Sequence, residues 1–276
     1  MKVIKSLTQM LALCHHQDAK VGFVPTMGYL HEGHLSLVDA AKKECNVTIV
    51  SIFVNPAQFG PQEDLANYPR DLERDLKLLE ERGVDYVFFP DKTMMYPKGF
   101  RTWVEVSELS DLLCGVSRPG HFRGVCTVVL KLVNIIKPRF MYMGEKDFQQ
   151  LSILRIMLKD LNLTTQIVAC PIVREADGLA KSSRNIYLSA QERTIATSLY
   201  RALYQARDSV NQGILDAHAL VENAITLLTQ AGAKPDYVAI VDARDLSEVI
   251  SIDSHSRMLI AAFVGKTRLI DNMMLK

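Results

Sequence analysis

The chain has 276 residues, of which 48% are hydrophobic and 23% are charged, and its formal net charge is +1. This balance is typical of an ordinary soluble globular protein with ample core, and the length suggests about two domains. The near-neutral charge gives no electrostatic reason to expect nucleic acid or an anionic membrane as a partner. The longest apolar runs, such as 259–264, are far too short to span a bilayer.

The N-terminus and the cysteines both bear on the compartment. Residues 1–9 lack a continuous apolar core and a small-residue cleavage site, so we do not expect a signal peptide. The five cysteines are odd in number and scattered, with no C-x-x-C pair. We therefore expect reduced, mostly buried thiols in a cytoplasmic protein.

In chain order, a leading helix over 4–16 is followed by alternating strands and helices. The apolar runs predict strands over 21–25, 47–54, 84–89, 103–106, 140–143 and 166–170. Helical spacing of apolar residues predicts helices over 35–44, 70–82 and 125–136, and one that follows 144–147 and ends near 161. This alternation is the pattern of an α/β domain with a parallel sheet.

We place a domain boundary near residue 173, which divides the chain into 1–173 and 174–276. Beyond it, Ser189 and Glu192 have the spacing of a capping box, which marks the start of a helix. The elements predicted here are helices over 189–211 and 216–230 and strands over 237–241, 258–264 and 267–270. Helices followed by strands indicate a small α+β second domain.

The loop after the first strand of this sheet carries two glycines and two histidines. In an open parallel sheet this loop lies at the carboxyl edge, where ligands bind. Gly28 and Gly33 let the backbone approach a ligand, and His31 and His34 stand where a helix begins, whose free N–H groups suit phosphate. Two solvated histidines or a metal site are the other interpretations, but the zinc motif needs four-residue spacing and a third ligand. The strand, the glycines and the helix favour a nucleotide site.

Two more loops reach the same predicted edge. Residues 55–58 follow the strand over 47–54 and begin a loop that continues to residue 64. Residues 144–147 follow the strand over 140–143, although a charged turn in solvent is the simpler interpretation of their acidic and basic side chains. Because loops from several strand ends converge in open α/β sites, we favour a contribution of both loops to one site.

The segment Lys181–Arg184 offers two hydroxyls, an ammonium and a guanidinium within four residues. A polar linker is the simple interpretation, and alone the tetrapeptide is a weak signal. Arg presents a fixed fork of donors to phosphate oxygens, and a loop between domains can close over a site and exclude water. Combined with the histidine motif, the segment therefore indicates a grip on phosphate.

Five motifs, in order and spread over nearly the whole chain, resemble those of one family. They are residues 25–34, 55–59, 118–125, 144–150 and 181–185, which read PTMGYLHEGH, NPAQF, RPGHFRGV, GEKDFQQ and KSSRN. This succession is similar to that of the pantothenate synthetases (pantoate–β-alanine ligases), members of the nucleotidyltransferase superfamily that carries an H-x-G-H motif. Five ordered motifs are far more specific than any one of them.

The resemblance implies a fold and a reaction. The family's fold is a Rossmann-like parallel-sheet N-terminal domain followed by a smaller α+β C-terminal lid domain. Its members are typically homodimers that use ATP and Mg2+, whose ligands the motifs do not identify. They join (R)-pantoate to β-alanine through a pantoyl-adenylate, releasing AMP and pyrophosphate, on the route to coenzyme A. The protein's part in adenylation is mainly to position the reactants and to neutralise phosphate charge.

The resemblance also assigns roles residue by residue. The residues that would bind ATP are Met27, Gly28, Tyr29, Leu30, His31, Glu32, Gly33, His34, Gly144, Glu145, Lys146, Asp147, Val173, Lys181, Ser182, Ser183 and Arg184. The catalytic residues among them would be His31, His34, Lys146 and Arg184. His34 would act as proton donor or transition-state stabiliser. Lys146 would touch phosphate, Asp147 the ribose and Val173 the adenine.

The acceptor site is implied in the same way. Gln58 and Gln150 would hold pantoate, and Gln58 would also meet β-alanine. Val125, Val128 and Val129 share one helical face and would line the space around the pantoate methyl groups, although core packing explains them equally well.

The chain departs from the family pattern at two positions, and two other protein classes compete with the ligase. Lys181 stands where the family usually has Met, and its charge either touches phosphate or faces solvent. Met143 replaces the usual Phe.

A nucleotidylyltransferase of the same superfamily would act on a phosphate acceptor and would not need the pantoate amides. Loss of His34, Lys146 or Arg184 would have indicated a catalytically silent nucleotide-binding or scaffold protein, and all three are present.

Overall fold

The computed structural model describes residues 1–15, 19–61 and 63–276. Two residues with a predicted place, His16 in the leading helix and Gln62 in the loop after residue 58, lie outside this part of the chain. Among the helices of the described residues, none combines the length and the apolar character that crossing a bilayer requires.

The described residues form two compact units. We call them the N-terminal unit, which comprises 1–145 and 153–171, and the C-terminal unit, which comprises 146–152 and 172–276. Helix α7 (Phe148–Asp160) therefore begins in the C-terminal unit and ends in the N-terminal unit.

The N-terminal unit is built on an open parallel sheet. Its six strands, counted within the described residues, are β1 (Lys2–Ile4), β2 (Val21–Thr26), β3 (Val47–Ile52), β4 (Tyr86–Phe88), β5 (Phe140–Gly144) and β6 (Gln166–Cys170), in the order β1-β4-β3-β2-β5-β6. From β2 the chain moves first to β3 on one side and later to β5 on the other. The direction of winding therefore reverses at β2, and open α/β sheets bind ligands at such a switch point.

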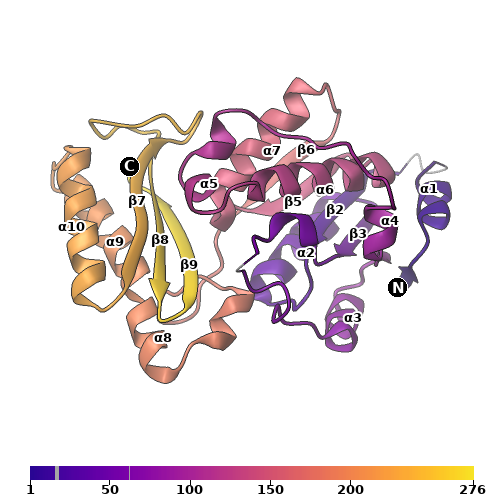
Figure 1. Ribbon diagram of the computed structural model, residues 1–276, viewed down its shortest axis with the longest axis horizontal. Coiled ribbons are helices and arrows are strands. Elements are labelled where there is room, and N and C mark those ends of the chain that lie inside the picture. The colour runs from indigo at the N-terminus through magenta and orange to yellow at the C-terminus, as the bar shows by residue number, and fades with distance from the viewer. Residues whose placement is uncertain (16–18, 62) are drawn as a thin grey trace. The chain divides into compact units, whose positions relative to one another are not determined.

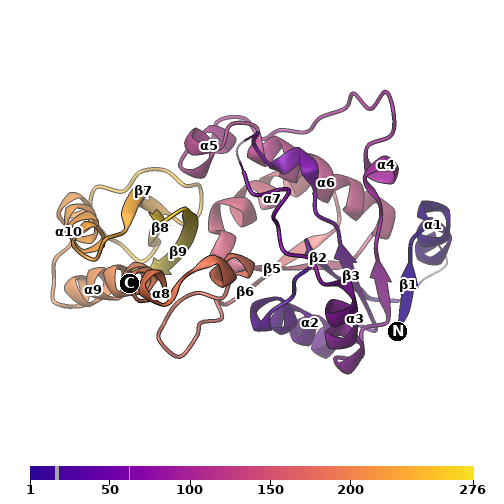
Figure 2. The same ribbon diagram turned by 60° about the horizontal axis from the view of Figure 1, so that its bottom comes forward.

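Helices cover both faces of this sheet. Besides the C-terminal part of α7, the α-helices of this unit within the described residues are α1 (Leu7–His15), α2 (Glu32–Glu44), α3 (Leu72–Glu81), α4 (Lys92–Met95), α5 (Cys114–Ser117) and α6 (His121–Ile136). Figure 2 shows α2 and α3 on one side of the strands and α6 on the other. Val24, Val50 and Val87 are paired across three strands and pack with Leu79 of α3. Successive residues of a strand point to opposite faces, so Phe23 is buried on the α6 side.

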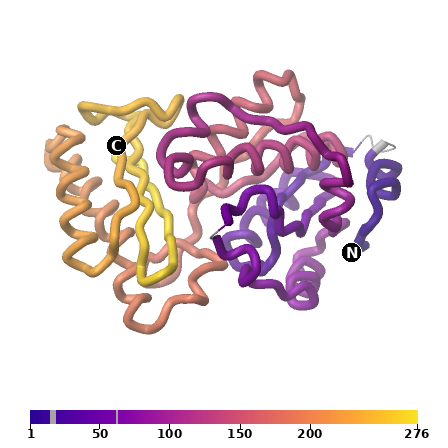
Figure 3. The backbone as a smooth tube through the Cα atoms, viewed as in Figure 1, coloured from indigo at the N-terminus to yellow at the C-terminus, as the bar shows by residue number. Residues whose placement is uncertain are grey.

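The C-terminal unit combines helices with an antiparallel sheet. After the short 3-10 helix η4 (Ser183–Tyr187) come α8 (Ala190–Ala196), α9 (Ser198–Asn211), α10 (Ala217–Gln230), β7 (Lys234–Asp242), β8 (Ser256–Val264) and β9 (Thr267–Met274). The strands pair in the order β7-β8-β9, and Figure 1 shows α9 and α10 against one face of this sheet. Leu203, Leu220 and Ile260 belong to the core between them. The β8–β9 hairpin, yellow in Figure 3, turns at Gly265 and Lys266.

The predicted fold class, an α/β unit followed by a smaller α+β unit, is confirmed, but three element predictions are wrong. Residues 103–106 are not a strand, because the N–H of Val104 donates to the Oγ1 of Thr127 at 3.0 Å instead of joining a ladder. The leading helix predicted over 4–16 begins only at Leu7, and residue 4 belongs instead to the short edge strand β1. The helix predicted over 189–211 is two helices, divided at Thr197.

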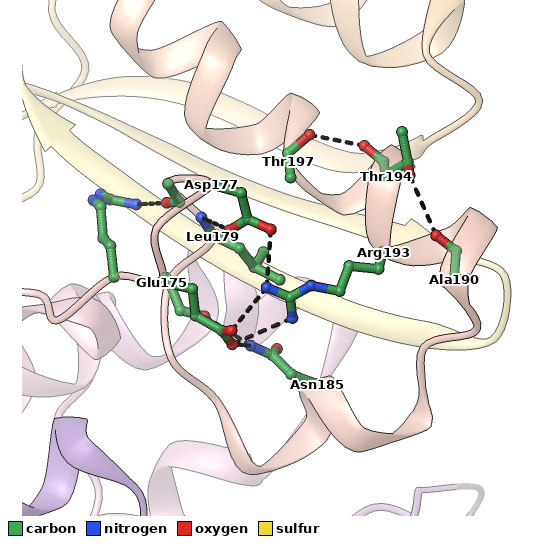
Figure 4. A network of polar contacts seen from close by, with 11 residues as sticks. Glu175, Asp177, Leu179, Asn185, Ala190, Arg193, Thr194 and Thr197 are labelled. Atoms are coloured by element: carbon green, nitrogen blue, oxygen red, sulfur yellow. Dashed lines mark hydrogen bonds and ion pairs between the residues drawn. The ribbon is translucent and has the colours of Figure 1, made fainter.

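The division at Thr197 has a local cause. The Oγ1 of Thr197 donates to the carbonyl of Thr194 at 2.8 Å, and the Oγ1 of Thr194 donates to that of Ala190 at 3.2 Å (Figure 4). Side chains that bond to preceding carbonyls compete with the helical pattern and often bend a helix. The capping box predicted from Ser189 and Glu192 is confirmed at the start of α8.

Candidate active site

The two histidines of the first motif form the start of α2. His31 is the N-cap, and its Nδ1 accepts the N–H of Gly33 at 3.1 Å, while the Nδ1 of His34 accepts the N–H of His31 at 3.4 Å. The two rings lie 4.0 Å apart between centroids. Because each Nδ1 is an acceptor, the proton of each neutral imidazole is on Nε2. The helix start thus carries two N–H donors in addition to its backbone N–H groups.

The turn before His31 requires left-handed backbone at two successive residues. Gly28 has φ +83° and Tyr29 has φ +49°. A Cβ on Gly28 would lie 3.1 Å from both the Oδ2 of Asp75 and the Cγ2 of Ile52, which is tighter than an ordinary contact. Glycine at position 28 therefore meets a conformational need and a steric one.

The carboxylate of Asp75 on α3 fixes this turn. Its Oδ2 accepts the N–H of Tyr29 at 2.6 Å, and its Oδ1 accepts the N–H of Leu30 at 2.7 Å. The Asp75 side chain is only 1% exposed. Its pKa lies above the ordinary value because the effect of burial outweighs the opposite effect of the two backbone N–H groups. Arg74 bonds the carbonyl of Leu30 at 2.9 Å. Helix α3 therefore sets the path of the chain into His31.

Gln58 lies at the end of the 3-10 helix η1 (Pro56–Gln58), which follows β3. Its Oε1 accepts from the Nδ2 of Asn55 at 3.0 Å, and its Nε2 donates to the Sδ of Met27 at 3.3 Å. Asn55 is buried, its Nδ2 also donates to the carbonyl of Gly124, and its Oδ1 accepts from the hydroxyl of Tyr96 and from the N–H of Ala57. Asn55 thus fixes which end of the Gln58 amide presents N–H groups.

Helix α6 supports Gln58 from its first two turns. The Nδ1–H of His121 donates to the carbonyl of Gln58 at 2.8 Å, because the Nε2 of the same ring accepts from Arg118 at 3.1 Å. Arg118 also forms two hydrogen bonds with Glu63, at 2.7 and 2.6 Å. A Cβ on Gly124 would lie 2.2 Å from the carbonyl oxygen of Ala57, so α6 and η1 touch backbone to backbone. The motif over 118–125 is therefore the support of the 55–58 loop.

The strand ends predicted to share one edge do so. Strands β3, β2 and β5 are neighbours and parallel, and their carboxyl ends lead into η1, the Gly28–His34 loop, and Gly144 with Glu145. Within the N-terminal unit, the structure brings Met27 into contact with Gln58. Val125, Val128 and Val129 are buried in α6.

The remaining site residues predicted from the motifs belong to the C-terminal unit. Lys146 and Asp147 lie in the 3-10 helix η3 (Glu145–Asp147), and Gln150 lies in the first turn of α7. Val173 and Lys181 are adjacent, because the N–H of Lys181 donates to the carbonyl of Val173 at 2.9 Å. The Oγ of Ser182 caps η4 by accepting the N–H of Arg184 at 3.3 Å, and Ser183 is buried.

A charged network holds the loop between Val173 and Lys181. Arg193 of α8 donates to both carboxylate oxygens of Glu175, at 3.3 and 2.8 Å, and to Asp177 at 2.9 Å (Figure 4). Asn185 of η4 donates to Glu175 at 3.2 Å and to the carbonyl of Ala180 at 3.1 Å. The loop and the Lys181–Arg184 segment after it are thus fastened to one another and to α8.

Comparison with known proteins decides the family. A sequence model described as pantoate-beta-alanine ligase matches residues 1–274. The chain belongs to the pantoate–β-alanine ligase family. It is 52% identical to the pantothenate synthetase of Thermosipho africanus and 53% identical to that of Thermotoga petrophila, in both cases over 100% of both chains.

Solved structures of this ligase family agree with the fold. The crystal structure of pantothenate synthetase from Thermus thermophilus has a TM-score of 0.96 and 44% identity, and covers 100% of this chain and 99% of that one. The pantoate–β-alanine ligase of Francisella tularensis, described as complexed with beta-gamma ATP and beta-alanine, has a TM-score of 0.85 and 37% identity, covering 100% and 98%. The resemblance drawn from the five motifs is confirmed, and with it the ligase class. The nucleotidylyltransferase alternative is not favoured.

Three residues that contact the predicted site segments or their supports escaped the sequence analysis: Asp75, Glu63 and Asn272. A signal existed for one of them, since Asp75 occupies an apolar-face position of α3, three residues after Leu72 and four before Leu79. An acidic residue on the buried face of a helix needs internal partners, and here these are backbone N–H groups.

Proposed function

We propose that the chain joins (R)-pantoate to β-alanine in two steps. The pantoate carboxylate attacks the α-phosphate of ATP, which yields pantoyl-adenylate and pyrophosphate. The amine of β-alanine then attacks the acyl carbon and releases AMP, leaving pantothenate. The observation that carries this proposal is the full-length family match together with an intact His31–His34 pair whose Nε2–H groups are held as donors.

The residues proposed for the nucleotide are those that the family resemblance assigns to ATP. The histidines His31 and His34 would donate to phosphate oxygens at the positive end of α2, where preorganised donors stabilise developing charge. Lys146 and Arg184 would add positive charge at the phosphates, and Val173 would contact adenine. The wider set proposed for ATP is Met27, Gly28, Tyr29, Leu30, Glu32, Gly33, Gly144, Glu145, Asp147, Lys181, Ser182 and Ser183.

The acceptor would be bound by the two glutamines. Asn55 occupies the Oε1 of Gln58, so Gln58 would present N–H groups to the pantoate carboxylate and later to β-alanine. Gln150, in the first turn of α7, is the second residue proposed for pantoate. This arrangement suits an acceptor that carries a carboxylate, since amide N–H groups bind anions without adding a competing charge.

Mg2+ would enter with ATP. The ion is usually held by one or two carboxylates together with substrate phosphates, and rarely by a cage of protein groups alone. The described residues contain no group of three or more His, Cys, Asp or Glu side chains that could hold a metal ion, which fits that mode of binding. Bound in this way, the ion would neutralise phosphate charge during adenylation.

We also propose that the protein is cytoplasmic and a homodimer. The five cysteines are free thiols, four of them buried, as is usual for proteins of a reducing compartment. The side chains of Trp103 and Val116 are 44% and 70% exposed, and they give the segment 101–117 apolar surface that a second copy could bury. Analytical ultracentrifugation would test the dimer directly.

The two-step reaction is tested by exchange of labelled pyrophosphate into ATP, measured with Mg2+ and without β-alanine. Exchange that requires pantoate would establish that an acyl-adenylate forms before the amine arrives. Absence of exchange, in protein shown to bind ATP, would contradict the proposal. A stable nucleotide conjugate of a phosphate-bearing acceptor, in place of free AMP, would favour the nucleotidylyltransferase.

A further inference from the structure

Strand β9 carries two buried polar residues in succession, Asp271 and Asn272, each 3% exposed. Neighbouring residues of a strand point to opposite faces, so these two side chains serve different surroundings. The Nδ2 of Asn272 donates to the backbone carbonyl of Lys146 at 3.0 Å, across 126 residues of sequence. Asn272 therefore fixes the peptide group that follows the Lys146 side chain.

The Asn272 amide is itself held in one orientation. Its Oδ1 accepts from the Nη1 of Arg257 at 2.6 Å, which leaves the Nδ2 end to face Lys146. Arg257 is 7% exposed, and its guanidinium lies 4.1 Å from the ring centroid of Phe148. The residues on either side of Asp147 are thus both contacted from the antiparallel sheet, Lys146 through Asn272 and Phe148 through Arg257.

Asp271 holds the other segment proposed for ATP. Its carboxylate accepts two hydrogen bonds from Arg174, at 2.6 and 2.9 Å, and Arg174 donates at 3.0 Å to the carbonyl of Gly178. Arg174 also lies 4.5 Å from the ring centroid of Tyr200, and a Cβ on Gly178 would lie 2.1 Å from a carbon of that ring. These contacts fix the loop that brings Val173 beside Lys181.

The charge of Lys146 also reaches this strand. Burial raises the pKa of Asp271, while the hydrogen bonds and charge of Arg174 and the charge of Lys146 act in the opposite sense. Lys146 is therefore within electrostatic range of Asp271 as well as bonded through its carbonyl to Asn272.

We propose that Asn272 is a positioning residue for Lys146, and that β9, through Asn272 and Asp271, is the common anchor of both ATP-binding segments in the C-terminal unit. This inference rests on the proposed function, because it takes Lys146 to act on the phosphates of ATP. A purely structural role would leave the chemical step intact in any variant that folds. A positioning role predicts a loss that depends on the Lys146 side chain being present.

The test is a double-mutant cycle with Asn272→Asp and Lys146→Ala, read by pantoate-dependent pyrophosphate exchange. Asn272→Asp keeps the shape and the acceptor for Arg257 but loses the donor to Lys146. We expect kcat of exchange to fall about 10²-fold, as misplacement by about 1 Å can cause. In the Lys146→Ala background the same change should cost less than about twofold, because coupled residues are not additive.

Controls separate positioning from damage to the fold. Asn223→Asp, at an exposed position of α10, introduces the same charge and should leave exchange and the melting temperature unchanged. If Asn272→Asp has a lowered melting temperature, Asn272→Ser replaces it in the test. The serine side chain is too short to reach the carbonyl of Lys146 and adds no charge, and its effect on exchange should depend on Lys146 in the same way. For Asn272→Asp and Asn272→Ser, we expect the Kd for ATP, measured by calorimetry, to be close to that of the parent protein.

Two results would overturn the inference. Equal losses in the two backgrounds would show that Asn272 acts independently of Lys146, and normal exchange in folded Asn272→Asp would show that it does not act at all. Failure of the proposed function looks different, because the parent protein would then show no pantoate-dependent exchange, or Lys146→Ala would exchange at the normal rate.

Discussion

The carboxylate of Asp75 accepts the backbone N–H of Leu30 at 2.7 Å, from a helix that begins about forty residues after the turn that it restrains. The next N–H towards the N-terminus, that of Tyr29, is bound at 2.6 Å by the other oxygen. One buried carboxylate thus satisfies two donors in a left-handed turn that no helix or strand could pair. The position of His31, one residue later, depends on this bond.

Replacing Asp75 by Asn should destabilise the fold and slow the reaction. The Asn amide offers one acceptor, and its NH2 group would face a backbone N–H, so one buried donor loses its partner. We expect the free energy of unfolding in urea to fall by about 1–3 kcal/mol. Asp39→Asn, at a 47% exposed ion pair with Arg82, is the matched control and should change stability by less than about 0.5 kcal/mol. Equal stability of Asp75→Asn and the parent would contradict this role.

Replacing either histidine of the pair should affect chemistry more than folding. His34→Ala and His31→Ala each remove an Nε2–H donor from the start of α2, and we expect pantoate-dependent exchange to fall by about 10²–10³-fold. The exposed His218, whose side chain is 81% accessible, provides the control His218→Ala with an unchanged rate. Near-normal exchange in a folded His34→Ala variant would exclude a transition-state role for that ring.

Local patterns in the sequence predicted the elements that position the first motif. The run of apolar residues before Pro25, the two glycines and the helical spacing after His34 all act over a few residues, and the structure has β2, a turn and α2 in that order. The strand predicted over 103–106 is absent, although the residues alternate as in a strand, because their backbone does not pair with another strand. Val104 bonds to Thr127, a side chain on another element, which no local pattern reveals.

The supports of the site were less accessible to sequence reasoning than the site itself. The motif residues could be assigned because a family resemblance covered them, whereas Asp75 and Asn272 act on backbone groups 45 and 126 residues away. The backbone is the same at every position, so such a contact leaves no recognisable pair of side chains in the sequence. A buried polar residue on an apolar face is the remaining signal, and it names the residue without its partner.

Replacing Gly124 by Ala should weaken pantoate binding. Alanine favours a helix over glycine by about 1 kcal/mol, so an unobstructed position in α6 would be stabilised. Here the new Cβ would lie 2.2 Å from the carbonyl oxygen of Ala57 and 2.7 Å from the N of Gln58, so η1 must move. We expect the Kd for pantoate in calorimetry to rise about tenfold, or about 1.4 kcal/mol, with ATP binding unchanged. A more stable variant with normal pantoate affinity would show that η1 adapts without cost.

The ion pair between Glu63 and Arg118 should make part of the stability depend on pH. Burial alone would raise the pKa of Glu63, but the hydrogen bonds and charge of Arg118 outweigh it, so this pKa lies below the ordinary 4.5. A lowered carboxyl pKa in the folded state means that folding favours the ionised form. The contribution is therefore fully present above the unfolded pKa and is lost as pH falls through the folded one.

Comparing the parent with Glu63→Gln isolates this contribution, because Gln keeps the size of the side chain and removes the charge. At pH 7 we expect the free energy of unfolding of the variant to be lower than that of the parent by about 1 kcal/mol, a value typical of a partly exposed ion pair. The difference should begin to shrink as the pH falls below 4.5, and it should approach zero only below the lowered pKa of Glu63 in the folded protein, where the carboxyl of the parent is protonated as well. Urea titrations of both proteins, repeated at decreasing pH from about 7 until the difference no longer changes, measure it. A difference that stays constant, or grows, as the pH falls would show that Glu63 stabilises this region by packing and not by its charge on Arg118.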